Sequence, residues 1–442
     1  MSRVTVAAVF ILLTALNFVR KVRAQEVITF PVRIDTVILV GNEKTRDFVI
    51  LREIPFTFPD SLTQEDLQQI NYRLQNLYLF NRVELNLMRF QNGKTALVIT
   101  VTEKWYFYPL PILFLNDRDW RKISFGLQVT HFNFRGRNEK FSMGGWLGYN
   151  PSFFLNYFNP WMGTRSRLIL GVSVYHKKVR NRIFDMNESH SGFDVTFGRR
   201  FTLWLQTQFK LSMDWVGLPP EYRTFNYSGR STDLVPSLFY EVLWDRRNLF
   251  EYPTKGFYLQ YIVQRTGFKE TQPRFWRFQF DNRIYLPLMR RISWGVRNLT
   301  IVQSGELPIY DRRYFGFNER IRGHFYTMYP AAEDFRQYSS PNLMLWSTEL
   351  RFSILPVRYY SWNNAPFMSY LYQNLKFGIS GAIFLDSGIV WQHPRDFALQ
   401  NYNTGFGAGI HFHLPYLTTL RIDYAFNEKW QGQLIVDIGA SF

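Results

Sequence analysis

The sequence predicts a membrane β protein, a transmembrane β-barrel of about 16 strands preceded by one small periplasmic α/β domain. Three observations predict it. Beyond Trp105, apolar and polar residues alternate with a period of two through most of the chain. Aromatic residues make up 19% of the sequence and cluster near strand ends, as in the run 105–108, where membrane barrels carry aromatic girdles. Positions predicted to face the lumen hold full charges, which the core of a soluble β-sandwich would exclude.

The N-terminus has the pattern of a secretory signal peptide. Arg3 precedes an apolar run from Val4 to Leu16, and residues 22–24 form a small-residue cleavage site. The alternative is a single membrane anchor, but this apolar run is short for one. No other segment of the chain approaches the roughly 18 apolar residues of a membrane-spanning helix. We therefore expect residues 1–24 to be removed on export.

Charge and cysteine content further restrict the class of protein and the kinds of site that the chain can have. The net charge is +17, and it becomes +13 when residues 1–24 are removed, since these hold four basic residues and no acid. Such a charge suits either nucleic acid or an anionic membrane surface, and the export signal favours the membrane. The chain has no cysteine, which excludes disulfides, thiolate metal sites and a lipoprotein anchor.

Residues 27–104 predict the α/β domain, in the order strand, helix, helix, strand, strand. Residues 34–40 (IDTVILV) form the first strand, and a short helix covers 44–53. The second helix follows a capping box in which Thr63 accepts from the helix N-terminus and Asp66 lies in the first turn. Its apolar face has helical spacing and consists of Leu67, Ile70, Leu74 and Leu77.

The domain ends in a predicted hairpin. Residues 83–90 and 95–101 are two strands joined at Asn92-Gly93, a dipeptide that favours tight β-turns. The first of the two is predicted to lie at the edge of the sheet, where its unpaired backbone groups would accept an incoming strand. The residues that mark this candidate edge strand are Val83, Leu85 and Leu87.

Residues 105–442 predict the barrel. Clean alternation runs over residues 205–215 and 346–354. At about 21 residues per strand and connection, this length holds about 16 strands, an even number as in bacterial barrels. The seam is predicted between a first strand near residues 123–130 and a closing strand over 433–442. One face of the closing strand consists of Leu434, Val436, Ile438, Ala440 and Phe442.

Short turns and long loops should alternate between the two ends of the barrel. Short periplasmic turns are predicted at residues 135–138 and 287–290. One predicted outer loop, residues 303–342, is the longest connection, and it contains the segment 314–324 (YFGFNERIRGH) with an arginine–glycine pair deep inside it. The other predicted outer loops are residues 177–192, 216–238 and 356–373.

Six barrel segments, taken in order, resemble one family. They read NFRGRNEKFSM (133–143), WDRRNLFEYPTKGFYLQ (244–260), YFGFNERIRGH (314–324), STELRF (347–352), IFLDSGIVW (383–391) and GFGAGIHFHLPYLTTLRIDYAF (405–426). Segments 34–50, 73–87 and 99–104 extend the match toward the N-terminus. The chain thereby resembles the Omp85 superfamily, the BamA and TamA type of outer-membrane protein known as bacterial surface antigen D15. The resemblance implies one POTRA domain over 27–104 and an Omp85-type barrel over 105–442.

In this family the sixth extracellular loop folds back into the lumen, and the resemblance implies that Arg322 and Gly323 form its core. By resemblance, the acidic partners on the barrel wall are Glu349 and Asp386. The strand phases agree, because both carboxylates lie opposite the apolar face of their own strand. A lumenal arginine between two carboxylates makes charge-assisted, bidentate contacts. A solvated loop arginine is the alternative.

The loop tip departs from the family pattern. The family usually reads valine, arginine, glycine and then phenylalanine or tyrosine, whereas this chain has Ile321-Arg322-Gly323-His324. His324 replaces aromatic packing area with a group that titrates near neutrality. The single POTRA domain is a second departure, since well-studied insertases have several, and it weighs against recruitment of large accessory complexes.

The remaining motifs give little indication of a functional site. His411 and His413 share one strand face, as metal ligands would, but they occupy lumenal positions where polar residues are expected and no third ligand is near. Gly405, Gly407 and Gly409 alternate in a strand, which indicates a thin inner wall or the close approach of another backbone. No nucleophile–base arrangement stands out. We therefore expect no catalytic residue, no metal and no cofactor, and a protein that is not an enzyme.

The resemblance implies an outer-membrane assembly, insertion or translocation factor of Gram-negative bacteria. The POTRA domain in the periplasm would receive substrate, and the barrel seam or lumen would pass it. The expected partners are outer-membrane lipid, lipopolysaccharide, unfolded outer-membrane or secreted proteins and accessory assembly proteins, with no nucleic acid. Two alternatives stay open: a two-partner-secretion-type transporter for one dedicated protein, and a passive or structural outer-membrane channel.

Overall fold

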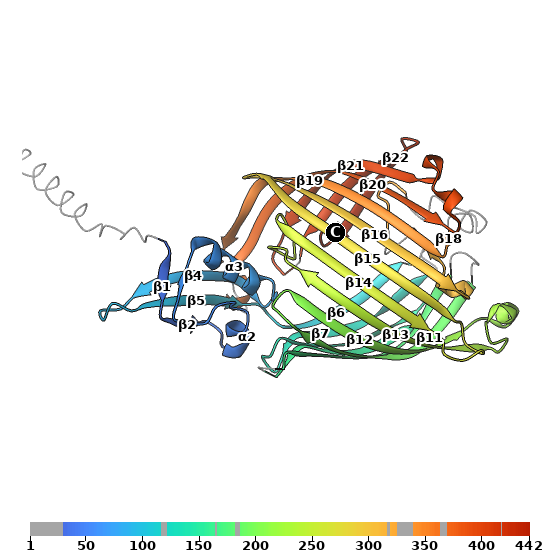
Figure 1. Cartoon of the computed structure of the whole chain (residues 1–442), viewed down its shortest axis with the longest axis horizontal. Coiled ribbons are helices and arrows are strands. Elements are labelled where there is room, and N and C mark those ends of the chain that lie inside the picture. The colour runs from blue at the N-terminus through green and yellow to red at the C-terminus, as the bar shows by residue number, and fades with distance from the viewer. Residues whose placement is uncertain are drawn as a thin grey trace, which may run out of the picture.

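A small α/β domain and a large β-barrel make up the described part of the chain, and Figure 1 shows the domain lying off one end of the barrel. The computed structural model describes residues 30–115, 122–163, 166–181, 186–315, 319–324, 339–362, 369–416 and 418–442. The predicted signal peptide, residues 1–24, lies outside these ranges. Within them, no helix is long and apolar enough to cross a membrane.

The α/β domain is built on a three-stranded sheet in the order β2-β5-β4. β5 pairs with β2 in parallel and with β4 in antiparallel orientation, so β4 is an edge strand as predicted. Side chains from helices α2 and α3 form one apolar core with this sheet. The elements are β1 (Val32–Ile34), β2 (Thr36–Val40), α2 (Asp47–Leu51), β3 (Asp60–Leu62), α3 (Gln64–Gln75), β4 (Phe80–Arg89) and β5 (Thr95–Glu103).

Local signals in the sequence explain the second helix and the hairpin. The Thr63 hydroxyl accepts from the Asp66 amide at 3.2 Å, and the Asp66 carboxylate accepts from the Thr63 amide at 2.9 Å, which completes the predicted capping box. Ile70 and Leu74 of α3 are fully buried in the domain core. The predicted hairpin between β4 and β5 is confirmed, with Gly93 at φ 81° in its turn.

Two elements of the domain are shorter than predicted. The first predicted strand is divided into β1 and β2 at Asp35, whose carboxylate and amide both bond to the backbone of Thr95. The first predicted helix contracts to α2, because the amides of Lys44 and Thr45 bond to the Glu103 carboxylate and hold this segment as a loop.

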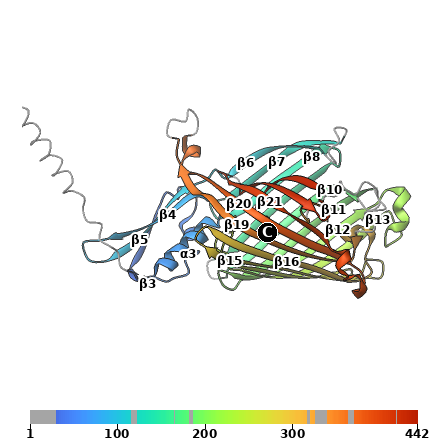
Figure 2. The same cartoon turned by 90° about the horizontal axis from the view of Figure 1, so that it is seen from above.

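The barrel is one antiparallel sheet of 16 strands among the described residues, the number that the sequence predicts. Figures 1 and 2 show the strands running obliquely around the wall of the barrel. The strands are β6 (Phe107–Leu115), β7 (Ile123–Phe134), β8 (Glu139–Gly148), β9 (Ser152–Met162), β10 (Leu168–Asn181), β11 (Met186–Arg200), β12 (Leu205–Gly217), β13 (Thr232–Asp245), β14 (Gly256–Thr266), β15 (Phe275–Met289), β16 (Ile292–Gly305), β19 (Asn342–Tyr360), β20 (Leu375–Trp391), β21 (Asn403–His413), β22 (Leu420–Asn427) and β23 (Gly432–Ile438).

The predicted strand phases are confirmed by which side chains are exposed. Phe209 on β12 and Ile383 on β20 point outward and are 53% and 56% exposed. Glu349 on β19 and Asp386 on β20 point inward and are at most 2% exposed. Apolar side chains therefore cover the outer wall while polar side chains line the lumen, as a membrane barrel requires.

The prediction of a long outer loop over residues 177–192 is wrong. β10 and β11 continue to pair up to Asn181 opposite Met186, so most of the predicted loop lies in paired strands. The polar residues of this segment therefore belong to paired strands rather than to a loop. The connections predicted over 216–238 and 303–342 are present but are shorter, because the flanking strands extend into them.

The connection predicted as an outer loop over residues 356–373 lies at the other end of the barrel. It joins β19 to β20 and contacts the α/β domain, where the Asn374 side chain donates to the Thr102 hydroxyl at 2.8 Å. The reason is the antiparallel order of the strands. The long connection between β16 and β19 occupies the outer end, so the next connection must return to the domain end. The short turn predicted at 287–290 falls between Met289 and Ile292.

The first barrel strand is β6, so the prediction that the seam begins near residues 123–130 is wrong. Those residues lie in β7, which pairs with β6 on one side and with β8 on the other. β6 contains Pro109 and Pro111, which have no amide hydrogen and belong on sheet edges. The sheet order runs from β23 to β6, and in the part of the chain that the structure describes no ladder joins these two strands.

Phe442 does not share the outer face of the closing strand, contrary to the prediction. β23 ends at Ile438, and Gly439, at φ 107°, lets the tail leave the strand direction. The Phe442 ring is 4% exposed and stacks on Tyr285 inside the barrel. A Cβ on Gly295 would lie 3.1 Å from this ring, so the glycine leaves room for an inward tail.

The α/β domain is attached to one rim of the barrel. The Arg46 amide donates to the Gly136 carbonyl at 2.9 Å, which places the predicted turn 135–138 at the domain end. The Asn76 side chain bonds to the backbone of the 246–255 connection between β13 and β14. Tyr106, which the sequence places in the aromatic girdle, is instead buried in the core of the domain.

Candidate functional site

Arg322 lies inside the barrel on the long connection between β16 and β19. The base of this connection is closed by a small ladder between β17 (Arg313–Tyr314) and β18 (Ser339–Ser340). Gly323 has φ 92°, in the left-handed region that favours glycine. A Cβ at Gly323 would also lie 2.6 Å from the Phe426 carbonyl oxygen on β22. Glycine is therefore needed here for both its backbone angle and its close contact with the wall.

Arg322 is 4% exposed, and its guanidinium group has partners on several sides. Its Nε and Nη2 donate to the two carboxylate oxygens of Asp386 at 2.7 and 2.9 Å, a bidentate pair. Its Nη1 donates to Glu349 Oε2 at 2.9 Å and lies 3.5 Å from Asp423 Oδ2. The guanidinium carbon also lies 3.5 Å from the centre of the Phe384 ring, a cation–π contact. The structure thus brings together the arginine and both carboxylates that the sequence singles out.

Each carboxylate around Arg322 lies beside a glycine on the neighbouring strand. Glu349 pairs with Gly295, Asp386 with Gly405, and Asp423 with Gly409. A Cβ on Gly405 would overlap the Arg322 carbonyl oxygen. Gly405 of β21 therefore leaves the space in which the loop backbone approaches the wall, as the alternating glycines of this strand predict, and Gly409 leaves space for the Asp423 carboxylate.

Arg322 belongs to a larger cluster of charges, which we call the lock cluster. It joins four guanidinium groups to four carboxylates, so its formal charge is balanced. Arg351 donates to Glu349 at 2.7 Å, Arg421 donates to Asp423 at 2.8 Å and to Asp437, and Arg320 forms an ion pair with Asp437. The members are Arg320, Arg322, Arg351, Arg421, Glu349, Asp386, Asp423 and Asp437.

Sequence reasoning missed part of this cluster. Asp423 is fully buried in the lumen, between the outward Ile422 and Tyr424. The same alternation that identifies Glu349 would have identified Asp423 as a third acid. Arg320 is two residues before Arg322 in the loop, but nothing local in the sequence shows that it reaches the last barrel strand.

The two histidines that share one strand face, as metal ligands would, have other partners. His411 Nδ1 lies 2.9 Å from the Tyr252 hydroxyl and its Nε2 lies 3.1 Å from Asp423 Oδ1. His413 Nε2 lies 2.9 Å from the Ser380 hydroxyl. Among the described residues, no group of three or more potential ligands is arranged to hold a metal ion.

The two residues that flank the arginine–glycine pair have different surroundings. Ile321 is fully buried in an apolar cluster with Leu299 and Leu343 of the wall. His324 Nε2 lies 2.7 Å from Glu428 Oε2 and 3.1 Å from the Thr404 carbonyl oxygen. The histidine at the loop tip therefore makes polar contacts with the outer ends of β21 and β22, where the family pattern has an aromatic ring.

Three of the predicted seam residues lie on the last strand of the sheet, whereas Phe442 packs inside the barrel. Leu434, Val436 and Ile438 are 60–62% exposed on the outer face of β23, while Asp437 points toward the lock cluster. On the other domain, Val83 of the edge strand β4 is buried, and the partly buried Leu85 and Leu87 pack against the domain core. β4 therefore offers a partner its free backbone edge rather than these side chains, which pack inward.

Comparison with known proteins identifies both regions. A family model described as "Omp85 superfamily domain" matches residues 133–442, and one described as "Surface antigen variable number repeat", of the POTRA type, matches residues 32–104. The chain matches none of the curated proteins.

Two solved structures share the fold. BamA from Haemophilus ducreyi lacking POTRA domains 1–3 is 14% identical, with a TM-score of 0.53 over 92% of this chain and 83% of that one. CdiB from Escherichia coli is 12% identical, with a TM-score of 0.53 over 92% of this chain and 74% of that one. At such identities the likeness concerns the fold alone.

Proposed function

Because the chain belongs to the Omp85 superfamily of outer-membrane insertion and translocation proteins, we propose that it handles unfolded polypeptide at the outer membrane of a Gram-negative cell. The POTRA domain receives the polypeptide in the periplasm, and the barrel passes it through its seam or lumen. Export of the chain itself would use residues 1–24 as a cleaved signal peptide. Its partners are then outer-membrane lipid, lipopolysaccharide and a protein substrate.

The edge strand β4 supports the receiving step. β4 pairs only with β5 among the described strands, so one row of its amides and carbonyls is left for another chain. An extended polypeptide can add to such an edge through main-chain hydrogen bonds that do not depend on its sequence. We propose the segment around Val83, Leu85 and Leu87 as this receiving edge.

The observation on which the proposal chiefly depends is a set of ion pairs. They join the long loop to the barrel wall and to the last strand, beside the unpaired seam. Arg322 is bound to β19, β20 and β22, and Arg320 is bound to Asp437 of the last strand, β23. β23 has no ladder with β6 in the described structure, and prolines at 109 and 111 remove two amide donors from β6. The loop therefore braces a wall whose seam is weakly joined.

Depletion of the protein, followed by proteomics of outer-membrane and secreted fractions, tests this function. Insertion predicts that several outer-membrane β-barrel proteins fall together, and secretion through a two-partner route predicts loss of one dedicated secreted protein. An unchanged proteome, together with high steady conductance of the purified barrel, would contradict both and favour a passive channel.

A further inference from the structure

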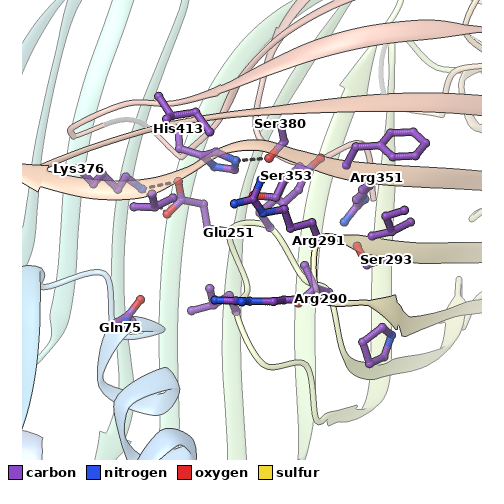
Figure 3. A pocket seen from close by; sticks show the side chains of 18 of the residues that line it. Gln75, Glu251, Arg290, Arg291, Ser293, Arg351, Ser353, Lys376, Ser380 and His413 are labelled. Atoms are coloured by element: carbon purple, nitrogen blue, oxygen red, sulfur yellow. Dashed lines mark hydrogen bonds and ion pairs between the residues drawn. The ribbon is translucent and has the colours of Figure 1, made fainter.

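A cavity of about 360 Å³ lies where the POTRA domain meets the rim of the barrel. Gln75, Asn76 and Tyr78 line it from the POTRA side. The barrel contributes the turn between β15 and β16, the 246–255 connection and the inner faces of β19, β20 and β21. Figure 3 shows this space between the helix that carries Gln75 and the strands that carry the labelled serines.

Among the polar side chains that line this cavity, two arginines and a serine form no ion pair or hydrogen bond with another described side chain. Arg290 and Arg291 are exposed, and within the described structure no carboxylate lies within ion-pair distance of either. The Ser293 hydroxyl, on a residue that is 6% exposed, has no hydrogen bond to another described residue. By contrast, Lys376 is paired with Glu251 and Arg351 with Glu349. Two cations and one hydroxyl are therefore available to a negatively charged ligand.

Part of the remaining lining is an extended apolar strip. Leu355, Val357 and Tyr359 follow one another on alternate positions of β19, and Leu249 and Ile292 also line the cavity. The cavity is also larger than a simple anion needs. It therefore suits a ligand that presents a carboxylate beside apolar groups, as an extended polypeptide does when acidic and apolar residues alternate.

The position of the cavity favours a soluble polypeptide over a lipid. Ser293 and Ser353 precede Trp294 and Ile354, whose outward side chains are 41% and 58% exposed on the opposite face of the same strands. The cavity is thus on the lumenal side of the wall, and the POTRA residues that line it lie in the periplasm. Tyr78 comes two residues before the start of β4, so a chain laid along the β4 edge leads toward the cavity.

We propose that this cavity binds an acidic segment of the polypeptide that the protein handles, with Arg290 and Arg291 pairing with its carboxylates at the entrance to the lumen. The inference rests on the proposed function, because it names the chemistry of the substrate at the point between POTRA domain and barrel. Arginine guanidinium groups pair well with carboxylates, and such pairs weaken as salt is added.

The test is binding of a defined peptide to the full-length protein in phosphatidylcholine nanodiscs, with empty nanodiscs as the blank. The probe is a fluorescein-labelled peptide of alternating aspartate and valine, and the reference is the same peptide with lysine in place of aspartate. The pocket variant is Arg290→Gln with Arg291→Gln. The matched control is Arg223→Gln with Arg230→Gln, which removes the same charge from the exposed outer connection between β12 and β13.

The proposal predicts saturable binding of the aspartate peptide and none of the lysine peptide. Affinity should fall roughly five- to tenfold in the pocket variant and stay unchanged in the control variant, as expected for loss of two charge-assisted contacts. Equal affinity in both variants, or no binding to the wild type, would overturn it. Displacement of the peptide by phosphatidylglycerol, seen in the wild type and lost in the pocket variant, would assign the arginines to a lipid headgroup instead. This assay does not depend on the depletion result, so the two proposals fail separately.

Discussion

At the scale of single residues, the lock cluster depends on the shape of arginine. The Arg322 guanidinium lies over the Phe384 ring while its edge meets Asp386 in a bidentate pair. A lysine could supply the charge but neither the planar stack nor the two-pronged contact. Glu349 and Asp386 could be predicted from strand alternation, together with the family resemblance. Which lumenal acids and arginines meet one another could not, because that depends on the stagger and curvature of the whole wall.

Gly405→Ala should destabilise the barrel, because the added Cβ would overlap the Arg322 carbonyl oxygen and push the loop off the wall. Overpacking of this kind costs about 1–3 kcal/mol. The measurement is the temperature at which the folded form is lost, followed by heat-modifiable migration on gels. Gly381→Ala is the matched control, since the nearest neighbour of its Cβ is the flexible end of the Ile354 side chain. Equal melting temperatures for the two variants would contradict the close approach of loop and wall.

At the scale of elements, the sequence predicts long amphipathic strands well and the ends of the sheet poorly. The alternation in β12 and β19 depends only on which residues face lipid, and it is visible locally. β6 could not be predicted as a strand because Pro109 and Pro111 interrupt the pattern that is typical of strands. The inward course of Phe442 also could not be predicted, since it depends on Gly439 in the tail and on the space left by Gly295 on another strand.

Arg320→Gln should loosen the last strand, because the pair between Arg320 and Asp437 joins the loop to β23. We expect faster hydrogen exchange in β23 and unchanged exchange in β19, which keeps both neighbouring strands and its contact with Arg322. The measurement is hydrogen–deuterium exchange with mass spectrometry on the detergent-solubilised protein. Arg395→Gln, on an exposed outer connection, is the control. If β23 is protected equally in both variants, the loop does not brace the seam.

At the scale of the whole molecule, hydrogen bonds and ring contacts connect the POTRA domain to the lock cluster. The Asn76 side chain at the end of α3 bonds to the 246–255 connection. Within that connection, the Tyr252 ring contacts Arg351 and its hydroxyl lies 2.9 Å from His411 Nδ1. Arg351 and His411 in turn contact Glu349 and Asp423 of the cluster. A shift of the POTRA domain would therefore displace residues that contact the lock cluster and its loop.

Lys104, at the end of the POTRA domain beside the barrel, makes the stability of the folded state depend on pH. Burial lowers the pKa of Lys104 to about 8, with Lys376 adding to the effect and Glu251 opposing it. Below pH 8 the lysine is charged in both folded and unfolded states, and folding carries the desolvation penalty. Above pH 8 the folded state releases its proton while the unfolded state keeps it up to about pH 10.4, so stability rises with pH across this window.

Lys104→Met should therefore be more stable than the wild type at pH 7, by up to about 3 kcal/mol. The difference should shrink as the pH rises from 8 to 10. The urea midpoint of the POTRA domain, followed by its helical circular dichroism signal, measures it. Lys94→Met, at an exposed hairpin position, is the control. A difference that does not change with pH would show that packing rather than charge is responsible.

The most direct test of the central claim is Arg322→Ala, compared with Arg395→Ala on the exposed outer connection. Removing one partner of a buried ion pair typically costs about 3–5 kcal/mol. We predict that Arg322→Ala lowers the melting temperature of the folded barrel and fails to restore the outer-membrane and secreted proteome of depleted cells, while Arg395→Ala restores it. Normal barrel stability together with a fully restored proteome in Arg322→Ala would contradict the account.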